Sequence, residues 1–214
     1  MGNPFHGFAG QRSVNMSDTS APMIVAAILA GGAGRRMGQR KAAVKLAGLP
    51  LAAWAARALA PGVAAMAVVG DAAAAADLSA AALEDLPVDV RGPLVGVGAA
   101  LVWAKARGAD WLVTAPCDTP LLPADLVSDL LSGSRDADVA FARTEDGDHP
   151  LVAAWRVRLA SRIAEMLGAG SHPPVHELMA DLGGAPVWFA NAAAFLNVNT
   201  LEDLALAEDL IARR

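Results

Sequence analysis

The 214-residue sequence has a single cysteine, no excess of positive charge and no long apolar run. Because Cys117 has no second cysteine to pair with, an internal disulfide is excluded and the chain needs no oxidising compartment. A net charge of −5 argues against a surface that coats nucleic acid. No apolar run approaches the roughly 20 residues that span a bilayer. We therefore expect a cytoplasmic protein with neither nucleic-acid nor membrane partners.

The first residues also lack the apolar core of a signal peptide, and we expect residues 1–22 to form a mobile tail. Residues 23–214 contain no linker and no internal repeat that would divide them. A hydrophobic content of 55% is sufficient for one sizeable core. The sequence thus predicts a single domain over 23–214.

The most distinctive stretch is an apolar run followed by a glycine-rich basic loop, at 24–41. Its β-branched, uncharged start predicts a first strand that is buried on both faces of a parallel sheet. Glycines lack the Cβ atom, so several backbone N–H groups can turn toward one anion. Glycines and cations together favour a polyphosphate site over a tight turn or a solvated face. The residues concerned are Gly31, Gly32, Gly34, Gly38, Arg35, Arg36, Arg40 and Lys41.

Two standard nucleotide motifs do not fit this loop. A P-loop ends in Gly-Lys-Ser/Thr, whereas Gly38 is followed by Gln39. A dinucleotide fingerprint places its third glycine three residues after the second, where this chain has Met37. The loop therefore predicts a phosphate site of another class.

Strands and helices alternate along the rest of the chain, which predicts a mainly parallel sheet covered by helices. Such sheets bind ligands at the carboxyl ends of their strands, so we expect the glycine loop, Gly70, Asp85 and Asp118 to line one crevice. A polar turn is expected at 145–149, and the tryptophans and Cys117 are expected in the core. Predicted strands lie at 66–69, 111–115, 139–142, 151–155 and 187–189, and predicted helices begin at Pro50, Ala72, Gly92, after Pro123, near Leu159, at Val175 and after Thr200, where Asp203 completes the cap.

Asp118 is the first candidate for a metal ligand. It follows a predicted buried strand and is held between Pro116 and Pro120. Mg²⁺ takes one or two carboxylates and completes its octahedron with water and phosphate oxygens, which suits an aspartate at a strand end near phosphates. The alternative is a cap for the next helix, and Asp125 lies nearer that role. We therefore favour the metal ligand.

Five sequence blocks, taken in order, resemble the molybdenum cofactor guanylyltransferase family. The glycine block alone is shared with many nucleotidyltransferases and sugar-nucleotide pyrophosphorylases, whereas the five together are far more specific. The resemblance implies a three-layer Rossmann-like nucleotide-diphosphosugar transferase fold and Mg²⁺-dependent transfer of GMP from GTP to Mo-molybdopterin, with molybdoenzyme assembly proteins as further partners. The blocks are L-A-G-G-x-G-R-R-M-G-x-x-K at 29–41, G-P-L at 92–94, P-C-D-T-P at 116–120, D-H-P at 148–150 and F-x-N-V-N-T-x-E-D-L at 195–204.

The resemblance also implies roles for individual residues. It assigns the magnesium ion to Asp118 and a nucleotide contact to Asp85, seven residues before G-P-L, with Asp89 as the alternative. Gly70 stands where the family often has a nucleotide-binding asparagine. Further nucleotide contacts fall on Leu29, Ala30, Gly31 and Lys41, with Gly32 and Gly34 added from the loop itself, and the pterin side on Asn197 and Asn199. His149, beside Pro150, is a further candidate for the pterin side, although a lone histidine in a polar turn is more often structural.

The expected chemistry needs no general base, because the attacking group is already a phosphate anion. Backbone donors, Lys41, Arg35 and an ion on Asp118 would neutralise the charge that develops on the phosphates. Asp85 is suited equally to guanine and to a ribose hydroxyl. The alternatives are a cytidylyltransferase for the same pterin, a sugar-nucleotide pyrophosphorylase, or a non-catalytic nucleotide-binding partner in molybdoenzyme assembly.

Overall fold

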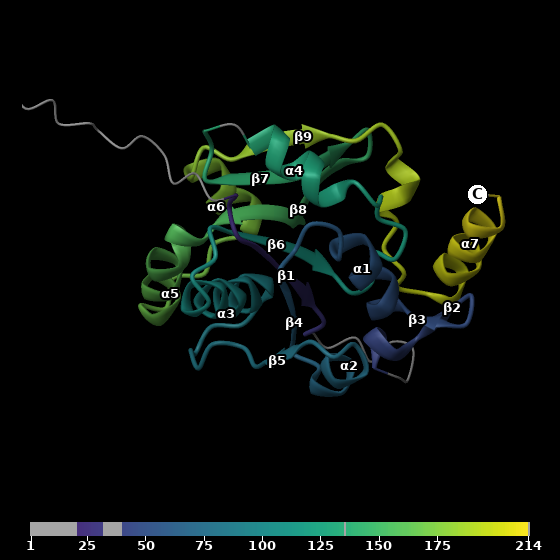
Figure 1. Ribbon diagram of the computed structural model, residues 1–214, viewed down its shortest axis with the longest axis horizontal. Coiled ribbons are helices and arrows are strands. Elements are labelled where there is room, and N and C mark those ends of the chain that lie inside the picture. Colours follow the sequence, from purple (N-terminus) through teal and green to yellow (C-terminus); the bar gives the residue numbers. More distant parts are fainter. Residues whose placement is uncertain (1–20, 32–39, 135, 214) are drawn as a thin grey trace, which may run out of the picture.

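The structure is a computed structural model that describes residues 21–31, 40–134 and 136–213 (Figure 1). The expected N-terminal tail lies outside the described residues up to position 20. Gly32, Gly34 and Arg35 of the glycine-rich loop also lie outside them. The division into a tail and a single domain over 23–214 stays a prediction.

A seven-stranded sheet forms the centre of the protein, in the order β5-β4-β1-β6-β8-β7-β9. β1 lies between β4 and β6 and runs parallel to both. β8 runs antiparallel to its neighbours β6 and β7, while β7 and β9 are again parallel. The predicted, mainly parallel sheet is confirmed. The strands are β1 (Ile24–Leu29), β4 (Ala65–Val69), β5 (Ala81–Leu83), β6 (Trp111–Pro116), β7 (Val139–Thr144), β8 (Gly147–Arg156) and β9 (Ala185–Trp188).

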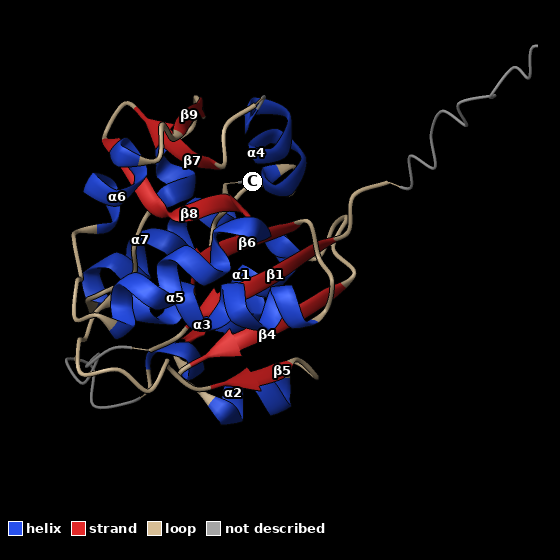
Figure 2. Ribbon diagram, turned by 90° about the vertical axis from the view of Figure 1, so that its left-hand side faces the viewer, coloured by secondary structure: helices blue, strands red, loops and turns tan. Residues whose placement is uncertain are grey.

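Helices cover both faces of the sheet and give three layers (Figures 1 and 2). Successive β1 residues point to opposite faces, so Val25 and Ala27 join one core cluster and Ala26 and Ile28 join the other. These four side chains are fully buried, as predicted for the first strand. The first cluster includes α3 (Pro93–Ala106), α5 (Ala160–Gly168) and α6 (Val175–Asp181), and the second includes α1 (Leu51–Leu59), α2 (Ala72–Asp77) and α4 (Leu126–Ser134).

A third, smaller core lies between α7 (Leu201–Ala212), the hairpin of β2 (Lys45–Leu46) and β3 (Leu49–Pro50), and the segment around Val198 (Figure 1). It includes Leu46, Leu51 and Val198. Thr200 and Asp203 form the predicted capping box of α7. The short 3₁₀ helices are η2 (Lys41–Ala43), η3 (Val157–Leu159) and η4 (Ala192–Phe195).

Three details differ from the sequence predictions. The expected polar turn at 145–149 is shorter, because β8 already begins at Gly147 and pairs His149 with Ala142 next to a register shift in β7. Neither the short edge strand β5 nor the hairpin of β2 and β3 was predicted from the sequence. Trp188 is 63% exposed and not in the core, because it ends the edge strand β9. In the described part of the chain, no helix is both long enough and apolar enough to cross a membrane.

Candidate active site

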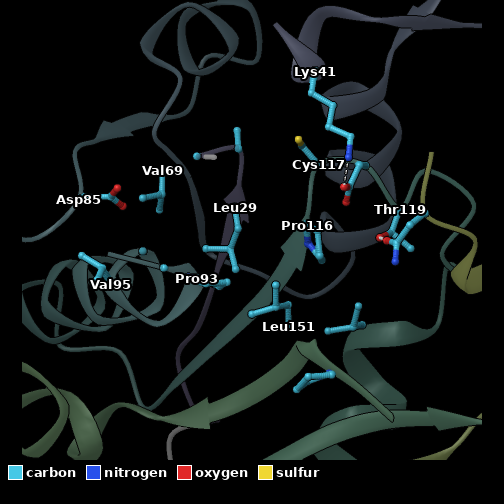
Figure 3. A pocket seen from close by; sticks show the side chains of 18 of the residues that line it. Leu29, Lys41, Val69, Asp85, Pro93, Val95, Pro116, Cys117, Thr119 and Leu151 are labelled. Atoms are coloured by element: carbon cyan, nitrogen blue, oxygen red, sulfur yellow. Dashed lines mark hydrogen bonds and ion pairs between the residues drawn. The ribbon is translucent and has the colours of Figure 1, made fainter. Parts of the chain in front are cut away.

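A cavity of about 1000 Å³ opens at the carboxyl ends of β1 and β6 (Figure 3). Because it follows strand ends in a parallel region of the sheet, it lies where this class of fold binds ligands. The cavity brings together most of the described residues that the sequence singled out, whereas Gly70 and Asp89 are not among its lining residues. Those that line it are Leu29, Ala30, Gly31, Lys41, Asp85, Asp118, His149, Asn197 and Asn199.

Lys41 and Asp118 form an ion pair at one end of this cavity (Figure 3). The Lys41 Nζ atom lies 2.5 Å from Asp118 Oδ2 and 2.5 Å from Asn199 Oδ1. Both side chains of the ion pair are only 20% exposed, so their attraction is screened less than that of a surface pair. Three distant segments of the chain therefore meet around one ammonium group.

The backbone on both sides fixes the position of Asp118. The N–H of Cys117 donates to the carbonyl of Leu29, and the N–H of Val198 donates to the carbonyl of Asp118. These bonds tie the residue to the end of β1 and to the Asn197–Asn199 segment. α4 begins only at Leu126, so Asp118 does not cap that helix.

The Asp118 carboxylate has capacity for a further partner. Its Oδ1 atom is buried and has no hydrogen-bond partner among the described residues. A buried carboxylate oxygen without a partner is costly unless a cation or another donor joins it. Across the described ranges, no group of three or more His, Cys, Asp or Glu side chains is placed to hold a metal. Asp118 therefore fits Mg²⁺, which needs few carboxylates when phosphates and water supply its other oxygens.

The two asparagines beside Asp118 are each held by a neighbour. Asn197 Oδ1 accepts a hydrogen bond from Thr119 Oγ1 at 2.7 Å. The backbone N–H of Asn199 donates to Asp203 Oδ2 at 2.9 Å. This backbone bond is the main reason that the pKa of Asp203 lies below its usual range, and the contacts with Thr200 act in the same direction. The cap of α7 thus also positions Asn199, a link that the sequence did not predict.

Asp85 lies across the cavity from Lys41, with Leu29 between them (Figure 3). It follows the edge strand β5, whose Leu83 carbonyl accepts the N–H of Gly70. The wall around it is largely apolar and includes Leu86, Val88, Val90 and Pro93. A carboxylate with an apolar wall is suited to a flat, polar-edged group such as a base.

Gly70 lies behind this end of the cavity, packed against the backbone of Gly31. Its φ angle is +83°, and a Cβ atom there would be 2.5 Å from Gly31 Cα and 2.8 Å from Gly31 N. A side chain therefore does not fit unless the start of the glycine loop moves. The family's asparagine has no equivalent in this conformation.

Arg40 and Asp71 form an ion pair that the sequence did not predict. Arg40 Nη1 lies 2.5 Å from Asp71 Oδ1, and the same oxygen accepts the N–H of Ala74 at the start of α2. The Asp71 side chain is 8% exposed and that of Arg40 is 54% exposed. This pair attaches Arg40, where the described chain resumes after the glycine loop, to the residue that follows Gly70.

His149 lies in β8 and lines the same cavity as the two asparagines. Its ring stacks on Phe195 with the centroids 4.7 Å apart, and its Nε2 lies 2.9 Å from Thr144 Oγ1. Burial lowers the pKa of His149 below its ordinary value, which favours the neutral form of the ring. Thr144 was not singled out from the sequence, because its partner lies across a turn.

Cys117 also lines the cavity, but its thiol is unreactive. Burial raises the pKa of its thiol to about 12, and the neighbouring Asp118 carboxylate adds to the effect. A thiol with this pKa is not a nucleophile at neutral pH. Cys117 therefore packs beside Asp118, as expected.

A family profile described as "MobA-like NTP transferase domain" matches residues 26–184. The chain belongs to this family. Membership of the MobA-like NTP transferase family confirms the resemblance that the five sequence blocks carry, and the three-layer fold agrees with it.

Within the MobA-like family, the chain is similar to relatives with more specific names. The chain is 44% identical over 187 residues to a molybdenum cofactor guanylyltransferase of Cereibacter sphaeroides, covering 86% of this chain and 95% of the relative. It is 40% identical over 191 residues to the protein of the same name in Rhodobacter capsulatus, covering 87% and 95%. The crystal structure of molybdopterin-guanine dinucleotide biosynthesis protein A from Archaeoglobus fulgidus has a TM-score of 0.67 at 25% identity, covering 90% of this chain and all of that one.

Proposed function

We propose that this protein transfers GMP from GTP to Mo-molybdopterin, forming molybdopterin guanine dinucleotide and pyrophosphate. The names of the relatives support this reaction, and one observation in the site carries it. Lys41 and Asp118, 77 positions apart, meet directly beside the end of β1, where the glycine-rich loop begins. A cation and an under-satisfied carboxylate at this point suit a triphosphate and its divalent ion.

In this proposal the start of the glycine-rich loop binds the phosphates. Leu29, Ala30 and Gly31 line the cavity. The Gly31 backbone is assigned to the nucleotide, because the Ala30 N–H already donates to Val69 and the Leu29 carbonyl already accepts from Cys117. Lys41 neutralises charge on the phosphates, and Arg35, outside the described residues, is assigned the same task. Because the attacking group is a phosphate anion, positioning and charge neutralisation suffice for the transfer.

Asp118 is the residue proposed to hold Mg²⁺. The bound ion would supply positive charge at the phosphate oxygens of the nucleotide. Asn199 lies within reach of the same ammonium group as Asp118 and keeps this end of the cavity polar. Backbone hydrogen bonds hold Asp118 and Asn199 in place before the substrate arrives, which avoids the cost of ordering these two residues during the reaction.

The two substrates are assigned to opposite walls of the cavity. Asp85 and the apolar residues around it are proposed to bind the guanosine, with the carboxylate accepting either from guanine N–H groups or from a ribose hydroxyl. Asn197, Asn199 and His149 are proposed to bind the pterin. The neutral, stacked ring of His149 offers a flat surface that suits a heteroaromatic ligand.

A substrate panel tests the proposed reaction. The purified protein is incubated with Mg²⁺, Mo-molybdopterin and one of GTP, CTP or ATP, and dinucleotide product and pyrophosphate are quantified. We expect equal amounts of molybdopterin guanine dinucleotide and pyrophosphate with GTP, and neither without the pterin. Preference for CTP would indicate the cytidylyltransferase alternative. In a parallel assay with a sugar phosphate in place of the pterin, pyrophosphate release would indicate a pyrophosphorylase. Nucleotide binding without turnover in either assay would indicate a non-catalytic partner.

We also infer that the protein acts in the cytoplasm, since its lone buried cysteine needs no oxidising compartment. We further infer that the product is delivered to molybdoenzyme assembly proteins. A pull-down of the product-loaded protein against such partners tests this inference.

A further inference from the structure

The ammonium group of Lys41 donates hydrogen bonds to two side-chain oxygen atoms at its end of the cavity. Its Nζ atom lies 2.5 Å from Asp118 Oδ2 and equally far from Asn199 Oδ1. The second carboxylate oxygen, Asp118 Oδ1, is buried. A divalent ion that binds Asp118, at either oxygen, therefore shares that carboxylate with the ammonium group of Lys41.

Binding a divalent ion and the ammonium group to the same carboxylate is unfavourable. At such short separations two positive charges repel strongly, and partial burial leaves the repulsion weakly screened. Lysine has a flexible four-carbon stem, so its ammonium group is able to move to another anion. The phosphates of a nucleotide in the adjoining part of the cavity would provide that anion.

We propose that Lys41 is the resident counter-ion of Asp118 in the nucleotide-free protein and excludes divalent metal from that carboxylate. Asn199 acts as a positioning residue that holds the ammonium group in place. Metal then gains the carboxylate only when Lys41 has moved to the triphosphate, so metal and nucleotide enter together. This inference rests on the proposed function, because it assigns the lysine's second position to the phosphates of that substrate.

Binding of Mn²⁺ to the nucleotide-free protein tests the exclusion directly, by electron paramagnetic resonance of the free ion. Removing a hydrogen bond between charged groups is worth about a tenfold change in equilibrium constant, so we expect Lys41→Met to bind Mn²⁺ about tenfold more tightly than the unmodified protein. Lys45→Met, which removes an exposed lysine four residues away, should leave the affinity unchanged. Adding Asp118→Asn to Lys41→Met should abolish the gain.

A second measurement follows the lysine itself. Acylation of Lys41 by a small anhydride, read by mass spectrometry, should become about tenfold faster when saturating Mn²⁺ displaces it, with Lys45 as the internal control. Unchanged Mn²⁺ affinity in folded Lys41→Met, or Mn²⁺ binding that leaves Lys41 protected, would overturn the proposal. Either result together with normal dinucleotide synthesis by the unmodified protein would leave the proposed function standing. Failure of that synthesis would instead refute the function.

Discussion

The backbone of Gly31 lies against Gly70 so closely that a Cβ atom on Gly70 would come within 2.5 Å of Gly31 Cα. Gly31 begins the glycine-rich loop and lines the cavity. Contact between these two residues therefore links the end of β4 to the lining of the cavity.

Gly70→Ala should displace the start of the glycine-rich loop. We expect a loss of stability of about 2–4 kcal/mol, since a side chain at positive φ adds about 1 kcal/mol to the cost of overpacking. The KM for GTP should rise about tenfold if the shift misplaces the phosphate donors by as little as an ångström. Thermal unfolding and steady-state kinetics measure the two effects.

Gly62→Ala provides the matched control for this substitution. Gly62 has a φ angle of +80°, but nothing lies within 4 Å of its Cβ position. The control should therefore lose only the roughly 1 kcal/mol of backbone strain and keep the KM for GTP unchanged. Equal effects at both glycines would contradict the contact as the cause.

Asp85→Asn should weaken nucleotide binding at the end of the cavity away from Lys41. Loss of a charged acceptor is worth about 1.5–3 kcal/mol, so we expect the KM for GTP to rise about tenfold or more. If Asp85 accepts from guanine, GTP should lose its advantage over ATP, and if it binds ribose, both should weaken alike. Asp89 does not line the cavity, so Asp89→Asn should change neither the KM for GTP nor the preference for GTP over ATP. A larger effect of Asp89→Asn than of Asp85→Asn would assign the nucleotide contact to Asp89.

His149 should give stability a pH dependence in mildly acidic solution. Because burial lowers the pKa of the folded state below its ordinary value of 6.5, the unfolded chain binds more protons between these two pKa values. The free energy of unfolding should therefore be unaffected by protonation of this histidine above pH 6.5 and should fall as the pH drops from that value toward the folded pKa. NMR titration of the ring should show the lowered pKa, and His149→Gln should flatten this part of the stability profile. A pKa above 6.5 would contradict the proposal of a neutral ring on the pterin wall; His176→Gln, at an exposed histidine, is the control.

Asp71 has two roles, as the cap of α2 and as the ion-pair partner of Arg40, and mutations should separate them. Asp71→Asn keeps a capping oxygen for the Ala74 N–H but removes the charge, whereas Asp71→Ala removes both. We expect a loss of about 0.5 kcal/mol for asparagine, because Arg40 is half exposed, and about 1–2 kcal/mol for alanine. Arg40→Gln should match the asparagine variant in chemical denaturation. Additive losses in Arg40→Gln/Asp71→Asn would show that the two side chains do not interact.

Sequence reasoning succeeded where neighbouring residues carry the information. β1 was predictable because a run of small and β-branched residues suits a strand buried on both faces, and Thr200 with Asp203 forms a local cap. The cavity position followed from Asp118 ending a strand. These features depend on spacing within a few residues.

What the sequence did not predict depends on contacts between distant positions or on very short strands. The contact of Lys41 with Asn199 spans 158 positions, and that of Arg40 with Asp71 spans 31. β5 and the hairpin of β2 and β3 have only two or three residues per strand, too few to show a periodicity. His149 was assigned to a turn because polar residues surround it, whereas pairing across a register shift extends β8 to Gly147.

The central claim is that Asp118, beside Lys41, is required for metal-dependent nucleotidyl transfer. The most direct test is the initial rate of dinucleotide formation by Asp118→Asn with GTP, Mo-molybdopterin and Mg²⁺, against Asp125→Asn as the control. Losing a metal-holding carboxylate removes several kcal/mol of transition-state stabilisation, so we expect a fall of about 10³-fold in Asp118→Asn, with thermal unfolding still cooperative. Asp125→Asn should keep its rate. A folded Asp118→Asn protein that works at nearly the original rate would contradict the account.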